Sequence, residues 1–181
     1  MPCPETWDVM KPDIIIRRER LGDEPQIFMV NELAFGQPAE AMLVNRLRDN
    51  GGVTLSLVAE FEGYIVGHIL FSPVTIDTQK GDVSVVGLAP LAVLPEFQKK
   101  GIGAMLIREG LAILKRAGHH AVVVLGHPGY YPKFGFMRST LFGIRWEHEA
   151  PDEAFMALEL KSGALSFGQG VVRFRPEFDA V

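Results

Sequence analysis

Cysteine is almost absent from this sequence. Among the 181 residues the only one is Cys3. A single thiol cannot form a disulfide within the chain, and it cannot build a cluster of cysteine ligands around a metal ion. The sequence therefore excludes an internal disulfide framework and a cysteine-based metal centre, and we expect no bound metal.

Long apolar runs are absent as well. No stretch approaches the roughly 20 consecutive apolar residues that a membrane-spanning helix requires. The segment 1–13 does not place a basic stretch before an apolar one, which is the pattern of a secretory signal. The sequence thus predicts a cytoplasmic protein that has no membrane as a partner.

Positive charge is not in excess. The chain has 18 Lys and Arg residues against 22 Asp and Glu residues, so its formal net charge is −4. This balance argues against nucleic acid as a partner, because general nucleic-acid binding normally needs a basic surface. It mildly favours a cationic substrate such as an amine. Hydrophobic residues make up 48% of the chain, which is enough for the core of one domain of ordinary size.

Hydrophobic periodicity and turn residues divide the chain into strands and helices. The helix between the fourth and fifth predicted strands indicates a right-handed crossover that makes these two strands parallel. The order of elements predicts an α/β (α+β) fold, a mixed sheet with helices packed on it. We expect strands over 14–20, 55–61, 64–71, 83–93, 121–125, 155–161 and 171–175, and helices over 24–35, 39–48, 104–117 and, briefly, 130–134.

A glycine-rich turn, Gln98-Lys99-Lys100-Gly101-Ile102-Gly103, joins the fourth predicted strand to the long helix. Backbone N–H groups at a helix N-terminus bind anions, and glycines let a ligand approach the backbone closely. Two lysines just before the positive end of the helix indicate a phosphate or pyrophosphate ligand. The alternative on spacing alone is an ordinary helix start with solvated lysines.

Two known phosphate loops do not fit this turn. In the P-loop of nucleotide hydrolases a Lys and a Ser or Thr follow the last glycine, whereas here both lysines precede the glycines. The dinucleotide-binding pattern G-x-G-x-x-G is broken by Leu106. A nucleotide hydrolase is therefore a poor interpretation of this sequence.

Residues 91–104 resemble the coenzyme A signature of the GNAT superfamily of N-acetyltransferases, Gln/Arg-x-x-Gly-x-Gly/Ala between the fourth strand and the third helix. A second element, Tyr131-x-x-x-Gly135-Phe136, resembles the Tyr-x-x-x-Gly-Phe motif that follows the fifth strand in this family. The resemblance covers residues 14–161 and is greatest to the bacterial YhbS-like branch. It implies the GNAT fold, a mixed central sheet with a splayed fourth and fifth strand pair and helices on both faces.

This resemblance also implies a division of the chain. Residues 1–13 would be an N-terminal extension, residues 14–161 the N-acetyltransferase domain, and residues 162–181 a C-terminal loop and strand that complete the same domain. The implied cofactor is acetyl coenzyme A, which serves as the acyl donor. Cys3 lies far from both motifs in the sequence, which favours direct attack by the amine in a ternary complex over an acetylated cysteine.

The implied donor site combines the turn with the strand before it. The turn would hold the pyrophosphate, and the exposed backbone of the fourth strand would pair with the pantetheine arm. Pro90 in this strand predicts a bulge or a splayed edge, because proline cannot donate to a sheet. The coenzyme-binding residues implied by the resemblance are Leu91, Ala92, Val93, Gln98, Lys99, Lys100, Gly101, Ile102, Gly103 and Ala104.

Tyr131 is the catalytic residue that the resemblance implies. Its phenol would protonate the departing thiolate as a general acid. Two alternatives are a hydrogen bond to the sulfur without proton transfer and a buried structural tyrosine. Tyr130, which precedes the motif, is interpreted as a packing residue.

The sequence leaves the general base and the acceptor open. Strand segment 85–93 contains no Asp, Glu or His, so the candidate bases are Glu60, His68, His127 or water. The implied acceptor is a small-molecule or peptide amine near the first two helices and the loop 140–152. In that loop, residues 146–149 would either contact the amine or form a solvated surface with one packed Trp. Dimers are common in the family, so a homodimer is compatible with the sequence. The alternative function is a coenzyme-A-binding regulatory module without turnover.

Overall fold

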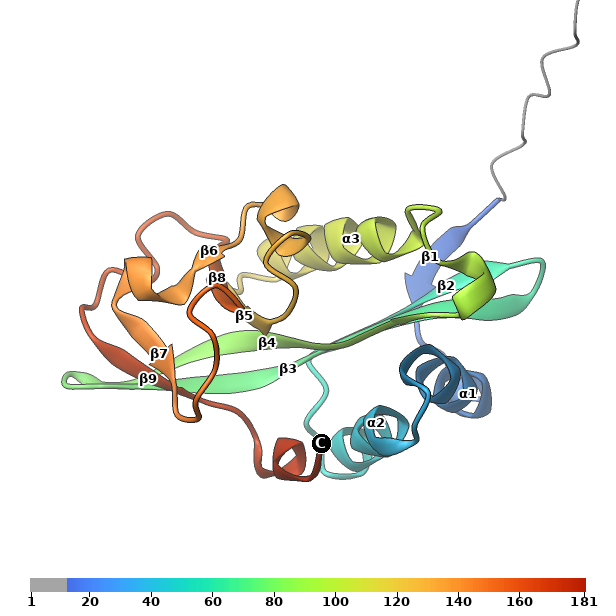
Figure 1. Ribbon diagram of the computed structural model, residues 1–181, viewed down its shortest axis with the longest axis horizontal. Helices are drawn as coiled ribbons and strands as arrows, with labels where there is room; N and C mark the ends of the chain where they lie inside the picture. The colour runs from blue at the N-terminus through green and yellow to red at the C-terminus, as the bar shows by residue number, and fades with distance from the viewer. Residues whose placement is uncertain (1–12) are drawn as a thin grey trace, which may run out of the picture.

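One mixed sheet with helices on both faces makes up residues 13–181, the part of the chain that the computed structural model describes (Figure 1). Cys3 lies outside this range. Helices α1 (Glu24–Phe35) and α2 (Ala39–Asp49) cover one face, and α3 (Ile102–Arg116) covers the other. The strands are β1 (Ile15–Arg18), β2 (Leu55–Phe61), β3 (Tyr64–Thr78), β4 (Gly81–Val93), β5 (Ala121–Leu125), β6 (Met137–Arg138), β7 (Ile144–Trp146), β8 (Phe155–Glu159) and β9 (Gly170–Arg173). Short 3₁₀ helices are η1 (Pro95–Phe97), η2 (Tyr131–Phe134), η3 (Ser139–Phe142) and η4 (Pro176–Ala180).

The sheet follows the order β1-β2-β3-β4-β5-β8-β6. Neighbours along this order are antiparallel except β4 and β5, which are parallel and joined through α3. The parallel pair predicted from the strand–helix–strand pattern is therefore confirmed. Strand β9 pairs with the far end of β3, and β7 pairs with β9, so residues late in the chain extend the sheet beyond its main path.

Strands β4 and β5 separate soon after they meet. They are paired at only two positions of β4, Val86 and Gly87, although β4 continues to Val93. Beyond Gly87, this edge of β4 has no strand beside it within the described residues. Its backbone N–H and C=O groups are consequently available to a ligand.

Pro90 lies in a bulge on the other side of β4. Ile69 of β3 pairs with Leu91, whereas Phe71 pairs with Leu88. Between these two pairs, β4 therefore contains one residue more than β3. The bulge predicted from the proline is thus present. It bends β4 at the point where the strand leaves β5, as extra residues in one strand of a pair generally do.

Helix α3 packs against the sheet through one apolar stripe. Its buried residues recur at helical spacing and include Leu106 and Leu114. A Cβ atom on Gly110 would lie 2.5 Å from a ring carbon of Phe71, so glycine is needed for this helix to lie so close to β3. The resulting contact fixes the distance between the middle of α3 and β3.

The segment between β5 and β8 contains more structure than the sequence predicts. We expected a loop over 140–152, but the structure has part of η3 and strand β7 there, and β6 precedes them. Strand β3 also runs to Thr78 rather than ending at Phe71, because alternate residues of its second half remain buried. These elements depend on partners far along the chain, which local patterns do not reveal.

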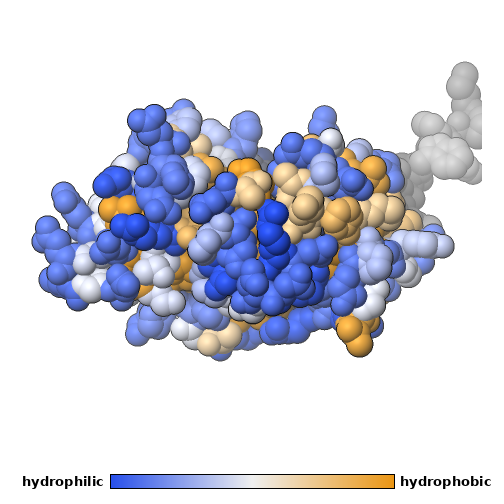
Figure 2. All heavy atoms as spheres, turned by 90° about the horizontal axis from the view of Figure 1, so that it is seen from below, coloured by the Kyte–Doolittle hydropathy of each residue, from blue (hydrophilic) through white to orange (hydrophobic). Residues whose placement is uncertain are grey.

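Figure 2 views the face that carries α1 and α2, where hydrophilic residues dominate and apolar residues gather in small patches. The exposed large apolar side chains of these two helices are Met29, Leu33, Phe35 and Met42. Among residues 13–181, no helix is both long enough and apolar enough to span a bilayer.

Candidate active site

The glycine turn forms the N-terminal end of α3. Gly101 precedes the helix with a φ of 85°, a left-handed conformation that glycine adopts without steric cost. The side-chain amide of Gln98 donates a hydrogen bond of 3.0 Å to the carbonyl oxygen of Val93, which ties the turn to the end of β4. The N–H groups of residues 102–104 lie in the first turn of the helix, where no carbonyl within the helix can accept from them. They and the helix dipole make this end of α3 an anion-binding site beside the open edge of β4.

A cavity of about 380 Å³ lies between this turn and the end of β4. Two residues that we assigned to the coenzyme do not line it. Ala92 is buried in the core, and the ammonium group of Lys100 lies 5.1 Å from the ring centroid of Phe97. The structure otherwise brings the assigned residues together, and the lining consists of Leu91, Val93, Phe97, Gln98, Lys99, Gly101, Ile102, Gly103, Ala104 and Tyr130.

Tyr130 lines the same cavity and lies against the turn. Its hydroxyl oxygen lies 2.8 Å from the position that a Cβ atom on Gly103 would occupy. The absence of a side chain at Gly103 therefore makes room for Tyr130 as well as for a ligand. The sequence suggested only a packing role for this tyrosine, since it precedes the recognised motif.

Tyr131 packs against Tyr130 and does not line the cavity. Its side chain is buried, with 8% of the residue exposed, and its ring meets those of Tyr130 and Phe136 edge to face, with centroids 5.4 and 5.7 Å apart. The ring packs against Gly126, where a side chain would collide with it. Burial raises the pKa of the Tyr131 phenol to about 12, so the hydroxyl is protonated at neutral pH.

Comparison with known proteins decides the family. The model of the acetyltransferase (GNAT) family matches residues 19–136. This chain belongs to that family. The uncharacterized N-acetyltransferase YhbS of Escherichia coli strain K12 is 38% identical over 167 residues, which are 92% of this chain and 99% of the relative.

Two solved GNAT structures are similar over almost the whole chain. The structure of Escherichia coli YhbS in complex with CoA has a TM-score of 0.87 and 37% sequence identity, and the match covers 93% of each chain. A GNAT acetyltransferase from Brucella melitensis in complex with acetyl-CoA has a TM-score of 0.76 and 39% identity, over 92% of this chain and 98% of that one. The fold predicted from the two motifs is confirmed.

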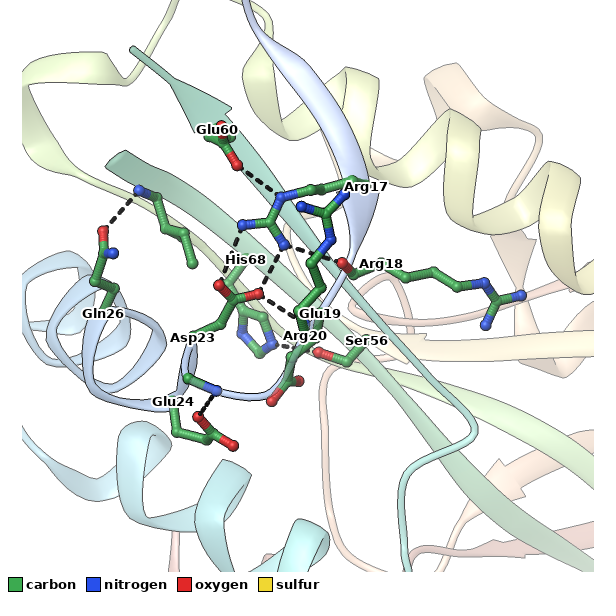
Figure 3. A network of polar contacts seen from close by, with 12 residues as sticks. Arg17, Arg18, Glu19, Arg20, Asp23, Glu24, Gln26, Ser56, Glu60 and His68 are labelled. Atoms are coloured by element: carbon green, nitrogen blue, oxygen red, sulfur yellow. Dashed lines mark hydrogen bonds and ion pairs between the residues drawn. The ribbon is translucent and has the colours of Figure 1, made fainter. Parts of the chain in front are cut away.

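Two of the candidate bases in this GNAT protein are committed to other contacts (Figure 3). Glu60 accepts a hydrogen bond of 2.6 Å from Nε of Arg17. His68 is completely buried, and its two ring nitrogens lie 3.0 Å from Nδ2 of Asn31 and 3.0 Å from Oγ of Ser56. Burial, with a smaller contribution from the charge of Arg48, lowers the pKa of His68 to about 3. His68 is therefore neutral at physiological pH and sealed from solvent.

His127 differs from these two residues, because it is exposed just beyond β5. Its Nδ1 atom accepts a hydrogen bond of 3.1 Å from the backbone N–H of Gly129. This contact orders the turn that leads to η2. Among residues 13–181, no three His, Cys, Asp or Glu side chains are grouped to hold a metal ion.

The Arg17 cluster predicts a measurable effect on stability. Nη1 of Arg17 lies 2.7 Å from Oδ2 of Asp23, while its Nε bonds Glu60, and all three side chains are mostly buried. We expect Arg17→Met to lower the free energy of unfolding by about 3 kcal/mol at pH 7, because two carboxylates lose their cation. Urea unfolding of the variant and the wild type measures this difference.

The same pair should respond to acid. The hydrogen bond from Arg17 is the main cause that lowers the pKa of Asp23. The stabilisation is therefore present above the unfolded-state pKa of about 3.9 and is lost as the pH falls through the folded-state value. The difference between the two proteins should narrow at acid pH. Arg116→Met is the control: its pair with Glu109 is exposed, with atoms 3.6 Å apart, so we expect a change below about 0.5 kcal/mol. Equal losses in both variants would refute the role of the cluster.

Proposed function

We propose that this protein transfers an acetyl group from acetyl coenzyme A to a primary amine of a small molecule or peptide. The observation that carries this proposal is the junction of an unpaired β4 edge with the N-terminal end of α3, which together line one cavity. The GNAT family membership and the two similar proteins solved with CoA and acetyl-CoA support the same ligand.

The cavity offers one kind of contact for the pyrophosphate of acetyl coenzyme A and another for its pantetheine arm. The N–H groups at the start of α3 suit the anionic pyrophosphate, and Lys99 adds positive charge at the same place. The free N–H and C=O groups of Leu91 and Val93 suit the amides of the pantetheine arm, which would lie beside β4 like an added strand. The thioester would then point along β4 toward Gly87, where β5 begins to pair.

The reaction we propose is direct attack in a ternary complex. The lone pair of the neutral amine nitrogen forms a bond to the thioester carbonyl carbon, and the C–S bond breaks. The nitrogen loses one proton, and the sulfur gains one from the hydroxyl of Tyr131, which is restored from water. Backbone N–H groups of β4 polarise the carbonyl oxygen as its charge develops, and the site holds both reactants in position.

Water and the exposed His127 remain as proton acceptors for the amine. Glu60 is held by Arg17, and His68 is buried with both ring nitrogens engaged. Neither side chain is free to take a proton from an incoming amine. Amines that are neutral at a lower pH should accordingly react at a lower pH.

Release of coenzyme A thiol from acetyl coenzyme A, measured over a panel of primary amines, tests this function. We expect release that depends on both the enzyme and at least one amine. Tight coenzyme A binding without release for every amine would instead favour the alternative, a coenzyme-A-binding regulatory module. A protein that fails to bind coenzyme A would contradict both.

A second measurement tests the ternary route. Incubation with acetyl coenzyme A alone should leave the mass of the protein unchanged, because no side chain is expected to carry the acetyl group. Trapping a stoichiometric acetylated protein that then passes its acetyl group to an amine would exclude direct attack.

A further inference from the structure

The C-terminal segment crosses the sheet on the side of α2, opposite α3. After β9 the chain turns back and η4 lies next to α2 (Figure 1). On the way, the ring of Phe174 covers Gly87, with a ring carbon 2.8 Å from the position that a Cβ atom on Gly87 would occupy. Because Gly87 is the last residue of β4 that pairs with β5, Phe174 lies at the point where the two strands separate. An acceptor that approaches the thioester from this face would meet Phe174.

Two further aromatic side chains join Phe174. Trp146 of β7 meets Phe174 edge to face, with ring centroids 6.2 Å apart. The ring centroid of Phe178 in η4 lies 5.1 Å from that of Phe174. These three rings border a cavity of about 430 Å³. Its volume is in the range of small-molecule sites in proteins.

Carboxylates supply the charged part of this aromatic cavity. Glu147 and Asp179 line it, and no Lys or Arg does among the described residues. Arg173 does not line the cavity, but its Nη1 lies 3.6 Å from Oε2 of Glu147, and its Nη2 lies 3.4 Å from Oδ2 of Asp77. One positive charge is thus shared between two carboxylates, and Asp179 adds a third negative charge. His148 also lines the cavity, with its Nε2 4.0 Å from Oε1 of Glu147. The three carboxylates outnumber this imidazole and the shared guanidinium, so negative charge is in excess.

The other large hollows of the molecule differ in their lining. The cavity of about 620 Å³ shares Trp146 and holds Glu149 and Asp152 beside Arg145, and the one of about 600 Å³ holds Asp77 and Arg145. A third, of about 420 Å³, is lined by Arg18, Arg20 and Arg48 together with Glu19 and Glu24. Aromatic faces and carboxylates together attract cations. The aromatic cavity combines them without a Lys or Arg from residues 13–181 in its lining, and it includes Phe174, which lies where β4 and β5 separate, so it is suited to a positively charged acceptor.

We propose that the aromatic cavity binds the acceptor as a primary ammonium ion carried on a small apolar or aromatic group. The inference rests on the proposed acetyl transfer, and it adds the chemical class of the acceptor. The rings of Trp146, Phe174 and Phe178 contact the apolar body and the ammonium group, while Glu147 and Asp179 balance its charge. The ammonium ion then loses its proton to water or to His127 before attack.

A binding experiment without acetyl coenzyme A tests this proposal. The chain has two Trp residues, and Trp7→Phe leaves Trp146 as the only one. The emission of Trp146 in this variant is followed during titration with phenethylammonium, uncharged 2-phenylethanol and anionic 3-phenylpropionate. We expect the ammonium ion to bind about tenfold more tightly than the alcohol, and the carboxylate to bind most weakly. Equal affinity for the ammonium ion and the alcohol, or a preference for the carboxylate, would overturn the proposal.

Charge-removing variants assign the preference to this cavity. Glu147→Gln combined with Asp179→Asn should bring the affinity for phenethylammonium down to that for the alcohol and leave coenzyme A affinity unchanged. Glu149→Gln is the matched control, because Glu149 lines the neighbouring cavity of about 620 Å³ instead. An ammonium preference that survives the double substitution, or that the control removes, would also overturn the proposal.

The two proposals fail in different ways. If no amine releases thiol from acetyl coenzyme A, acetyl transfer fails, whatever the titration gives. If amines are acetylated but phenethylammonium shows no preference at Trp146, acetyl transfer stands and this assignment of the acceptor site falls.

Discussion

Gly103→Tyr is expected to abolish coenzyme A binding while the fold stays intact. Even a Cβ atom at this position would lie 2.8 Å from the hydroxyl of Tyr130 and 3.8 Å from a side-chain carbon of Leu91. A phenol ring would therefore fill the cavity of about 380 Å³ between the glycine turn and β4. It would also cover the N–H groups at the start of α3 that suit the pyrophosphate. We expect the affinity for coenzyme A, measured by calorimetry, to fall at least about 100-fold.

Met105→Tyr is the matched control for this substitution. Met105 lies two residues further along α3, is exposed, and does not line the cavity. The Met105→Tyr substitution introduces the same side chain into the same helix but outside the cavity, so we expect coenzyme A affinity within about twofold of the wild type. Thermal unfolding of both variants shows whether the helix still packs. Unchanged affinity in a folded Gly103→Tyr protein would remove the glycine turn as the coenzyme site.

The sequence predicts the local structure around the glycine turn well because its signals are local. The glycine turn, the strand before it and the helix after it occupy one continuous stretch, 83–117. Each property that matters there is a property of neighbouring residues: the left-handed Gly101, the bulge at Pro90 and the start of an amphipathic helix. Such patterns can be interpreted without knowing which distant segments pack against them.

The opposite side of the sheet is harder to predict. Trp146 was expected in a loop, either as part of an amine site or as a packed residue on a solvated surface. In the structure it lies in β7, which pairs with β9, and its ring meets Phe155 and Phe174. The more distant of these partners, Phe174, is 28 residues from Trp146 in the sequence. Local periodicity carries no information about contacts of this kind.

Tyr130 and Tyr131 illustrate the same limit at shorter range. The motif identifies Tyr131, but it is Tyr130 that lines the cavity and touches the space above Gly103. Tyr130 immediately precedes η2 and Tyr131 is its first residue. The sequence alone does not say which of these neighbours faces a ligand. The structure decides between the two rings, because Tyr131 packs against Gly126 and Phe136 and thus away from the cavity.

Tyr131→Phe is expected to lower the rate of acetyl transfer much more than it weakens binding. The phenylalanine ring keeps the contacts with Gly126 and Phe136, so the fold and the coenzyme A affinity should change little. Only the hydroxyl is lost, and with it the proton that we propose for the departing thiolate. A positioned general acid contributes typically about 100-fold or more, so we expect kcat to fall by about that factor. Steady-state kinetics with a reactive amine and calorimetry with coenzyme A measure the two effects separately.

Tyr130→Phe separates this chemical role from packing. It removes a hydroxyl from the ring that touches Tyr131, at a centroid distance of 5.4 Å, without altering the proposed acid. We expect its kcat to stay within about threefold of the wild type, because no proton transfer is assigned to it.

With a pKa of about 12, Tyr131 holds its proton throughout the neutral range, so the ratio of wild-type to Tyr131→Phe rates should stay constant between pH 6 and pH 9, to about a factor of two. A wild-type rate in Tyr131→Phe would end the general-acid proposal, and equal losses in the two variants would assign the effect to the paired rings instead.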